Sequence, residues 1–135
     1  MIEDLLLHRA PFLFVNDIRI DDGKILGSYS FPENSDFFQG HFPNQPIVPG
    51  VLLIESMVQC GGAGVKLIEK SSSSLFVLMK VEQASFHRIV RPDEEVTMII
   101  ETLTSNGKLL NQKGKAFVES KLVAKAEWIC IDNSQ

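Results

Sequence analysis

One segment limits the folds open to this chain more than any other: a stretch of helix-forming residues that is apolar on nearly every side. It follows Pro49-Gly50 and reads VLLIESMVQC over residues 51–60. A helix with apolar side chains all round is stable only when protein surrounds it. The rest of the chain must therefore wrap around this helix.

Two polar residues and three glycines interrupt the apolar stretch. Glu55 and Gln59 are four positions apart, so they lie on one face of the helix. A carboxylate in such a helix costs several kcal/mol unless it is paired, protonated or open to a polar pocket. We therefore treat Glu55 as a candidate functional residue. Gly61, Gly62 and Gly64 predict that another part of the chain packs closely against the helix backbone.

A proline-rich segment precedes the helix and carries a histidine. Pro43, Pro46 and Pro49 recur every third residue, and each favours extended backbone in itself and its predecessor. The segment after His41 is therefore expected to be stiff. A lone loop histidine is more often structural than catalytic. Together with Glu55, however, His41 supplies the base and the acid that proton abstraction and leaving-group protonation require.

The start of the helix offers a third element. Gly50 and Val51 open it without a Ser, Thr, Asp or Asn to cap the first N–H groups. These donors, at the positive end of the helix dipole, are suited to hold a carbonyl oxygen that gains negative charge. A glycine that merely lets the chain turn is the alternative interpretation.

The composition narrows the classes of protein. With 135 residues, 44% hydrophobic and 22% charged, we expect a single globular domain over residues 1–135. A net charge of −4 without a basic block argues against nucleic acid as a partner. The polar interruptions of the helix argue against a membrane span. The acidic N-terminus is unlike a signal peptide, so we expect a cytoplasmic protein in which Cys60 and Cys130 are reduced core residues.

The rest of the chain has the pattern of strands joined by tight turns. We expect strands over residues 12–20, 24–31, 75–90, 95–103, 108–120 and 122–131, a helix over 51–69, a helical turn within 2–7 and a polar loop at 71–74. Asp22-Gly23 and Asn106-Gly107 predict hairpin turns, and a further turn is expected at 119–121. This order predicts an α+β fold with a curved antiparallel sheet wrapped around one long central helix. Because one sheet cannot cover every side of that helix, we expect a second subunit to help.

Three segments resemble the 3-hydroxyacyl-[acyl-carrier-protein] dehydratases. They read HRAPFLFVNDI from His8, FFQGHFPNQPIVPGVLLIESMVQ from Phe37 and KLVAKAEWIC from Lys121. The central segment is the specific one, since it combines Gly-His-Phe-Pro, Pro-Gly-Val-Leu and a Glu-x-x-x-Gln step at the family's spacing. The resemblance implies a hot-dog fold and a homodimer whose sheets join edge to edge, with three such dimers forming a hexamer in many members.

The resemblance also implies an active site shared between two chains, with the histidine from one and the acid from the other. His41 corresponds to the family histidine that takes the α-proton of the thioester. Glu55 corresponds to the acid that helps the β-hydroxyl group leave as water. No metal or organic cofactor is implied.

Substrate-binding roles follow from the same resemblance. Gly50, with the adjacent Val51 amide, falls where the family binds the thioester carbonyl. Gln59 corresponds to the glutamine that orients the acid by hydrogen bonding, and Phe42 and Pro43 correspond to residues that shape the acyl tunnel.

The sequence thus predicts a dehydratase that removes water from a 3-hydroxyacyl thioester on acyl carrier protein to give the trans-2-enoyl thioester. The pathway is fatty-acid synthesis or a related specialised lipid or polyene pathway. An acyl-thioesterase of the same fold and a non-catalytic acyl-binding subunit are the alternatives. Acyl chain length and carrier preference stay open, because three segments depart from the family pattern: Lys80-Val81-Glu82, Ala84-Ser85-Phe86-His87 and Pro92-Asp93-Glu94.

Two groups of charged residues complete the predictions. His8 and Arg9 are expected to form a surface or interface pair. A local basic patch that docks the carrier is a hypothesis, built from residues of the strand-rich half: Arg88, Arg91, Lys108, Lys113 and Lys115. Most such charges on a strand face are simply solvated.

Overall fold

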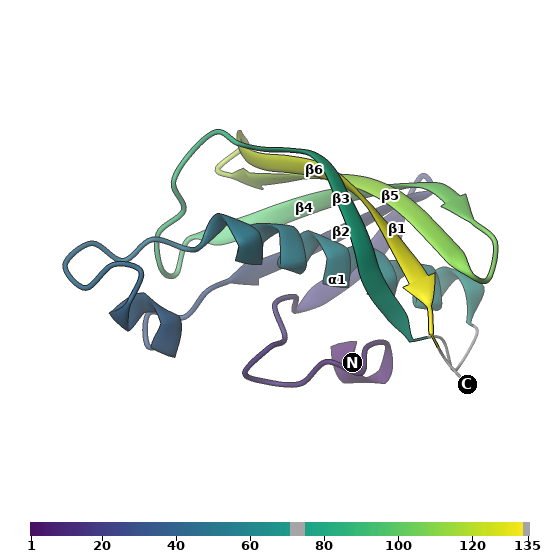
Figure 1. The fold of residues 1–135 in the computed structure, drawn as a ribbon, viewed down its shortest axis with the longest axis horizontal. Helices are drawn as coiled ribbons and strands as arrows, with labels where there is room; N and C mark the ends of the chain where they lie inside the picture. The colour runs from purple at the N-terminus through teal and green to yellow at the C-terminus, as the bar shows by residue number, and fades with distance from the viewer. Residues whose placement is uncertain (71–74, 134–135) are drawn as a thin grey trace.

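The computed structural model describes residues 1–70 and 75–133, so the polar loop predicted at 71–74 lies outside the described residues. A long helix lies along one face of a single sheet (Figure 1). In chain order the elements are η1 (Ile2–Asp4), β1 (Asp17–Asp21), β2 (Lys24–Ser30), η2 (Asp36–Gln39), α1 (Gly50–Glu69), β3 (Phe76–Phe86), β4 (Glu95–Ser105), β5 (Leu109–Val118) and β6 (Lys121–Asp132).

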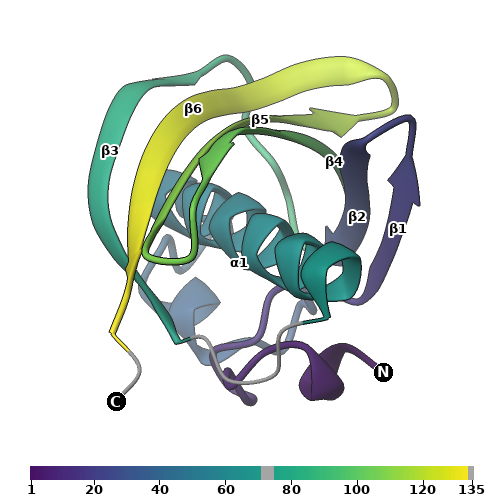
Figure 2. The ribbon, with the colours of Figure 1, turned by 90° about the vertical axis from the view of Figure 1, so that its right-hand side faces the viewer.

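The sheet is antiparallel and curves around α1. Its six strands follow the order β1-β2-β4-β5-β6-β3, which leaves β1 and β3 as the two edges. Figure 2, which looks along the helix, shows the sheet around α1 and the N-terminal segment on the side that the sheet leaves open. The predicted α+β fold with one central helix is confirmed.

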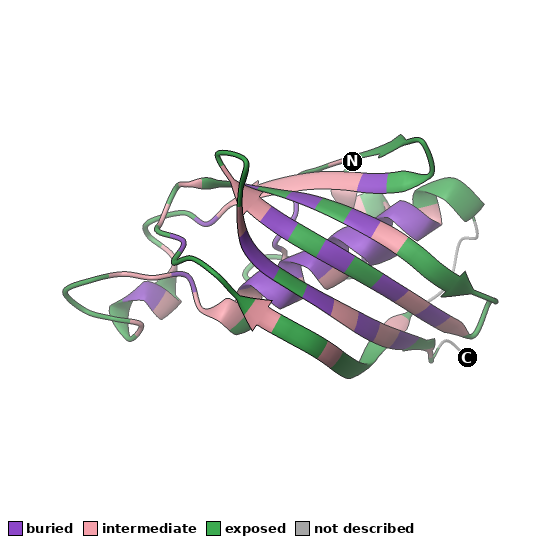
Figure 3. Cartoon of the chain, turned by 90° about the horizontal axis from the view of Figure 1, so that it is seen from above, coloured by how far each residue is buried: buried purple, intermediate pink, exposed green. Residues whose placement is uncertain are grey.

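Strand positions alternate between the helix side and the outside of the sheet (Figure 3). In β4, Val96, Met98 and Ile100 are buried, and the residues between them are exposed. This two-residue period follows from the pleat of a strand, in which successive side chains point to opposite faces. In β4, therefore, one face of the sheet packs on the core and the other faces outward.

The tight turns lie where the sequence placed them. Asp22 and Gly23 have positive φ values of 51° and 78° and join β1 to β2. Gly107 has φ 87° between β4 and β5, and Glu119 and Ser120 have φ 50° and 65° between β5 and β6. Positive φ at such positions matches the right-handed twist of a hairpin.

The glycines of α1 explain how the sheet approaches the helix so closely. A Cβ atom at Gly61 would overlap the amide of Gln112, and one at Gly64 would overlap Ile25. At Gly62 the nearest neighbour, the Leu6 side chain, would be at ordinary contact distance. The predicted close packing is therefore confirmed at Gly61 and Gly64.

Burial accounts for the apolar character of α1. By length and composition the helix is apolar enough to cross a membrane, but 61% of that stretch is buried inside the fold. Met57, Cys60 and Ala63 are fully buried beneath the sheet. Cys60 and Cys130 are both free and buried, as expected for reduced core cysteines.

One predicted strand begins later than expected. Only Asp17–Asp21 pairs with β2, and residues 12–16 leave the sheet. Instead, the Phe14 N–H donates to Gln59 Oε1 at 2.8 Å, and the Ser56 hydroxyl donates to the Phe14 carbonyl. Side chains of α1 thus pair the backbone N–H and carbonyl groups of Phe14. The β-like composition of residues 12–16 reflects packing onto the helix. The strand predicted over 75–90 is likewise shorter and ends at Phe86.

Candidate functional site

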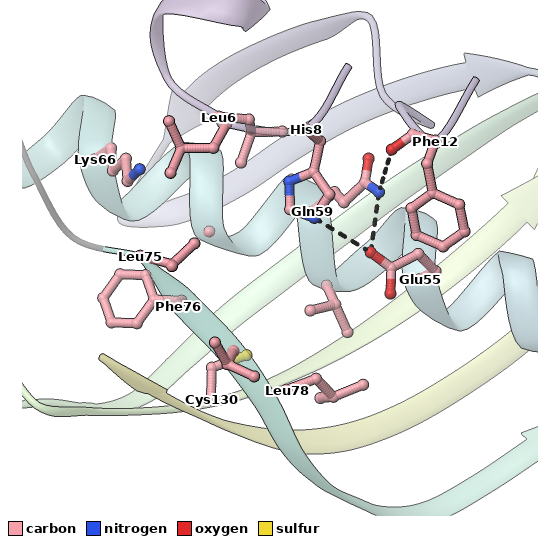
Figure 4. Close-up of a pocket in the computed structure, with 14 residues that line it drawn as sticks. Leu6, His8, Phe12, Glu55, Gln59, Lys66, Leu75, Phe76, Leu78 and Cys130 are labelled. Carbon is pink, nitrogen blue, oxygen red and sulfur yellow. Dashed lines mark hydrogen bonds and ion pairs between the residues drawn. The ribbon is translucent and has the colours of Figure 1, made fainter. Parts of the chain in front are cut away.

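An elongated hollow of about 330 Å³ lies between α1, the N-terminal segment and the end of the sheet at β3 (Figure 4). Its lining is mostly apolar. Three parts of the chain supply the lining residues. The N-terminal segment contributes Leu6, Leu7, His8 and Phe12, and α1 contributes Glu55, Val58, Gln59, Gly62 and Lys66. The sheet side contributes Leu75, Phe76, Val77, Leu78 and Cys130.

Glu55 is the only carboxylate among the described residues that line this hollow. The side chain is 19% exposed, and its Oε2 accepts a hydrogen bond of 2.9 Å from Gln59 Nε2. A carboxylate in this apolar helix was expected to be paired or open to a pocket. Glu55 is both, because it accepts a hydrogen bond from Gln59 and lines the hollow. This arrangement leaves the other carboxylate oxygen available to a bound molecule.

Gln59 is fixed by three hydrogen bonds. Its Oε1 accepts from the Phe14 N–H, and its Nε2 donates to the Phe12 carbonyl at 3.2 Å as well as to Glu55. With 1% of its surface exposed, the amide has no freedom to turn. The predicted contact between Gln59 and the acid is present. Its orienting role in a reaction stays a prediction.

His8 lies beside Glu55, which the sequence did not predict. Its Nε2 is 3.6 Å from Glu55 Oε2, within ion-pair distance but longer than a hydrogen bond (Figure 4). Its Nδ1 is buried without a hydrogen-bond partner. His8 therefore lies in the hollow and not on the open surface, whereas the expected interface role of His8 and Arg9 stays a prediction. Arg9, by contrast, is exposed and donates to the carbonyls of Leu6 and Glu3.

The position of His8 follows from tertiary packing. Arg9 ties together the turn that brings the N-terminal segment back along α1, and so turns His8 toward the helix. His8 and Glu55 are far apart in the sequence, so no periodicity connects them. The only signal that could have found His8 was its place at the start of the first segment that resembles the dehydratases.

His41 lies in the loop between η2 and α1, held by backbone contacts on both sides. Its N–H donates to the Phe37 carbonyl at 3.0 Å, and its carbonyl accepts from the Ile47 N–H at 3.0 Å. Its Nδ1 is 2.9 Å from the Ile47 carbonyl oxygen. Because a carbonyl can only accept, Nδ1 carries the proton of this bond, and Nε2 of the neutral ring keeps a lone pair. The ring is therefore prepared to act as a base through Nε2.

A single chain does not bring His41 and Glu55 together. His41 does not line the hollow around Glu55, and no hydrogen bond or ion pair joins the two side chains among the described residues. Figure 1 shows why: the loop from η2 to the start of α1 projects beyond the end of the sheet.

The first turn of α1 has no side-chain cap, as the sequence predicted. Pro49 occupies the N-cap position, and its carbonyl accepts from the Leu52 N–H at 2.9 Å. A Cβ atom at Gly50 would come within 2.8 Å of the Phe86 ring, so this position requires glycine for packing as well. Val51 is 70% exposed. Binding of a carbonyl oxygen here stays a prediction.

The remaining predicted residues lie outside the hollow. Phe42 is half exposed and its ring stacks on the His41 ring at 4.3 Å. Pro43 is exposed in the same loop. Neither contributes to the lining around Glu55. A role in shaping an acyl tunnel would require a second chain and stays a prediction.

The five predicted basic residues do not form one patch. Arg88 and Arg91 share a hollow with Lys121, whereas Lys113 and Lys115 line a different one on the outer face of the sheet. Lys108 borders neither of these hollows and lies beside the turn between β4 and β5. We grouped these residues because they are all in the strand-rich half of the chain. The sequence does not show which of them lie on the same surface of the folded protein.

The two thiols are held in their neutral form. Burial raises the pKa of Cys60 to about 12. Burial also raises the pKa of Cys130 to about 11, and the nearby charge of Glu55 acts in the same direction. Both thiols stay protonated near neutral pH, so Cys130 acts as an apolar part of the lining. No group of three or more His, Cys, Asp or Glu residues within the described ranges is arranged to hold a metal ion.

Solved structures share this architecture. The dehydratase heterocomplex ApeI:P from Xenorhabdus doucetiae contains a chain that superimposes with a TM-score of 0.83, covering 97% of this chain and 90% of that one at 15% identity. A mutant thioesterase from Pseudomonas aeruginosa superimposes with a TM-score of 0.68 over 90% of this chain and 82% of that one, also at 15% identity. At such identities the likeness concerns the fold, and it is the hot-dog fold.

Sequence comparison goes further. Residues 5–127 match the FabA-like domain family. A 3-hydroxyacyl-[acyl-carrier-protein] dehydratase FabZ from Ruminiclostridium cellulolyticum is 38% identical over 93% of this chain and 90% of its own length. Its counterpart from Protochlamydia amoebophila is 37% identical over 99% of this chain and 90% of its own. The chain belongs to this family of 3-hydroxyacyl-[acyl-carrier-protein] dehydratases, as its motifs predicted.

Proposed function

We propose that this protein removes water from a 3-hydroxyacyl thioester carried on acyl carrier protein and releases the trans-2-enoyl thioester, as a step of fatty-acid synthesis or a related pathway. The observation that carries the proposal is Glu55, a carboxylate fixed by Gln59 at a mostly apolar hollow in a chain of this family. An apolar lining suits an acyl chain, and the carboxyl group is suited to act on its hydroxyl group.

The chemistry needs one base and one acid. The thioester acidifies the adjacent α-carbon, and His41 Nε2 takes the α-proton from it. The electron pair of that C–H bond forms the double bond between the α- and β-carbons as the β-carbon–oxygen bond breaks. A proton from Glu55 converts the leaving hydroxyl group to water. The proton on His41 then returns to Glu55 through solvent, so the enzyme is restored without a cofactor.

The first turn of α1 completes the proposed site. The thioester oxygen gains negative charge as the α-proton leaves, and uncapped N–H groups at the positive end of a helix stabilise such an oxygen. Gly50 and Val51 supply those groups, and the lack of a side-chain cap supports the assignment.

We further propose that the working unit is a homodimer paired along β3. This strand is a free edge of the sheet with unusually exposed apolar side chains, namely Val77 (40%), Leu78 (36%), Met79 (60%) and Val81 (38%). A long apolar edge strand pairs readily with another chain. Part of β3 also lines the hollow around Glu55, so a second chain at this edge would stand beside the acid. Each site would then combine Glu55 with His41 of the partner subunit.

The test is an absorbance assay of enoyl-thioester formation with a 3-hydroxyacyl carrier-protein substrate. Wild type, His41→Ala and Glu55→Gln are compared, with far-ultraviolet circular dichroism to check that each variant folds. A general acid or base contributes about 10²–10⁴-fold, so each variant should lose at least about a hundredfold in kcat. A wild type that is inactive at every acyl chain length would overturn the proposed function.

A thiol reagent in the same assay tests the thioesterase alternative. Hydrolysis releases the carrier's thiol, whereas dehydration leaves the thioester intact. The thioesterases among the solved structures are 14–19% identical to this chain, so their likeness concerns the fold alone. Release of thiol in step with substrate loss would favour the thioesterase. Binding of acyl carrier protein without either product would favour the non-catalytic subunit.

A further inference from the structure

The hollow around Glu55 has a second charged residue at its other end. Lys66 lies eleven residues further along α1, about 16 Å at 1.5 Å per residue. The helix residues between them that line the hollow are Val58, Gln59 and Gly62, spaced by three or four positions. One stripe of the helix therefore begins with a carboxylate and ends with an ammonium group.

Apart from His8 and Gln59, the lining between these two ends is apolar. Leu6 of the N-terminal segment and Phe76 and Leu78 of β3 lie along it, as Figure 4 shows. An acyl chain that starts at Glu55 therefore contacts hydrocarbon along its length and meets Lys66 at its far end. A chain that ends in a methyl group would bury that ammonium against an apolar group, which is unfavourable.

Lys66 is partly buried, unlike most lysines. Burial lowers the pKa of its ammonium group, and the negative charge of Asp132 near the end of β6 acts in the opposite direction. On its other side Lys66 borders a second hollow, whose charged lining residues are Glu3, Asp4 and Lys70. Lys66 therefore has carboxylates on one side and the mostly apolar hollow on the other. An anionic or polar group that enters the hollow could accept a further hydrogen bond from the ammonium group.

We propose that Lys66 is a specificity determinant for the far end of the acyl chain, and that it favours chains ending in an oxygen acceptor, a terminal carboxylate above all. The proposal rests on the proposed function, because it assumes that the hollow holds the acyl chain. The ammonium donates a charge-assisted hydrogen bond to such an end group, and these bonds are stronger than neutral ones. A methyl end offers no acceptor.

The test uses two 3-hydroxyacyl carrier-protein substrates of equal chain length, one ending in a methyl group and the other in a carboxylate. Several lengths are compared in both forms, because the far end must reach Lys66. At the matching length, wild type should favour the carboxylate end by at least about tenfold in kcat/KM, since a hydrogen bond to a charged group is stronger than one between neutral groups. Lys66→Met should remove or reverse that preference.

Two controls separate the possible failures. Lys70→Met changes an exposed lysine at the end of the same helix that does not line the Glu55 hollow, and it should keep the wild-type preference. A short four-carbon substrate, which does not reach Lys66, should react equally well with wild type and Lys66→Met. If no substrate is dehydrated, the proposed function itself fails. If the short substrate reacts but wild type shows no preference for the carboxylate end at any length, or Lys66→Met keeps the wild-type preference, the role of Lys66 is overturned.

Discussion

Two histidines of this chain lie in contrasting surroundings. His41 is fixed by the Ile47 carbonyl in a loop beyond the end of the sheet and has no contact with Glu55 in its own chain. His8 lies 3.6 Å from Glu55, and its Nδ1 has no hydrogen-bond partner. His41, whose ring is held by a hydrogen bond, therefore lies away from Glu55 of its own chain. His8, which lies next to Glu55, has no comparable hydrogen bond to hold its ring.

The difference separates two kinds of task. A base needs a defined tautomer, and a carbonyl bonded to Nδ1 provides it, as at His41. A neighbour of the acid needs only to be close enough to influence its position and charge, as His8 is. If each site combines residues of two chains, as proposed, proximity within one chain does not decide which histidine is the base.

The largest expected effect comes from mixing two inactive variants. His41→Ala and Glu55→Gln homodimers should each be nearly inactive, but co-expressed chains form mixed dimers with one intact site if the two residues come from different subunits. With random pairing, about a quarter of the wild-type activity should return, because half of the dimers are mixed and each has one working site out of two. Activity is measured on the whole dimer population, and mixed dimers isolated through two different tags should have about half of the wild-type activity.

Control mixtures make this result decisive. A chain carrying both substitutions, co-expressed with wild type in equal amounts, should leave about a quarter of the activity, because a mixed dimer then has no intact site, whereas sites built within one chain would leave about half. If the mixed single variants stay inactive while dimers form, His41 and Glu55 act within one chain. The proposed sharing of each site between two subunits would then be wrong.

Replacing His8 should have a smaller effect than replacing His41. His8→Ala removes a neighbour of Glu55 at ion-pair distance, not a hydrogen-bonded partner, so we expect kcat to fall by about tenfold or less. His8→Asn, which keeps a polar side chain, should recover part of this loss. Arg9→Ala serves as a control for the fold of the N-terminal segment. A loss with His8→Ala as large as that with His41→Ala would show that His8 itself takes part in proton transfer.

Removal of Gln59 should affect stability as well as activity. Gln59→Leu leaves the Phe14 N–H without its acceptor, and a buried unpaired group costs about 1–3 kcal/mol. Urea unfolding should show a loss of that size in the free energy of unfolding. Gln112→Leu is the matched control, because Gln112 is also fully buried and bonded to Gly61 and Trp128 but does not line the hollow. Both variants should lose stability, and only Gln59→Leu should also lose kcat beyond what unfolding explains.

The smallest expected effect concerns Cys130, whose thiol should not react with an alkylating reagent in the folded protein. Its pKa is raised to about 11 and its surface is 2% exposed, so at pH 8 almost none of it is thiolate in the folded protein. Iodoacetamide should therefore label neither Cys130 nor Cys60 in the native state, while both react in urea, as mass spectrometry can verify. Rapid native labelling of Cys130 alone would mean that water enters the Glu55 hollow more freely than its lining suggests.

Much of the fold could be predicted from neighbouring residues. The apolar stretch after Gly50 predicts a buried helix, and Asp22-Gly23 and Asn106-Gly107 predict turns from the φ values that those residues tolerate. The same local logic places Glu55 and Gln59 on one helix face. It fails at residues 12–16, because a β-like composition does not distinguish pairing in a sheet from packing on a helix.

Local patterns predicted the buried helix, the hairpin turns and the pair of Glu55 and Gln59, because each depends on residues within a few positions of one another. Tertiary packing alone places His8 beside Glu55 and Lys66 at the end of the same hollow, and it divides four of the five basic residues between two other hollows. These neighbours are far apart in the chain. What brings them together is the burial of apolar surface across the whole domain, which no local pattern records.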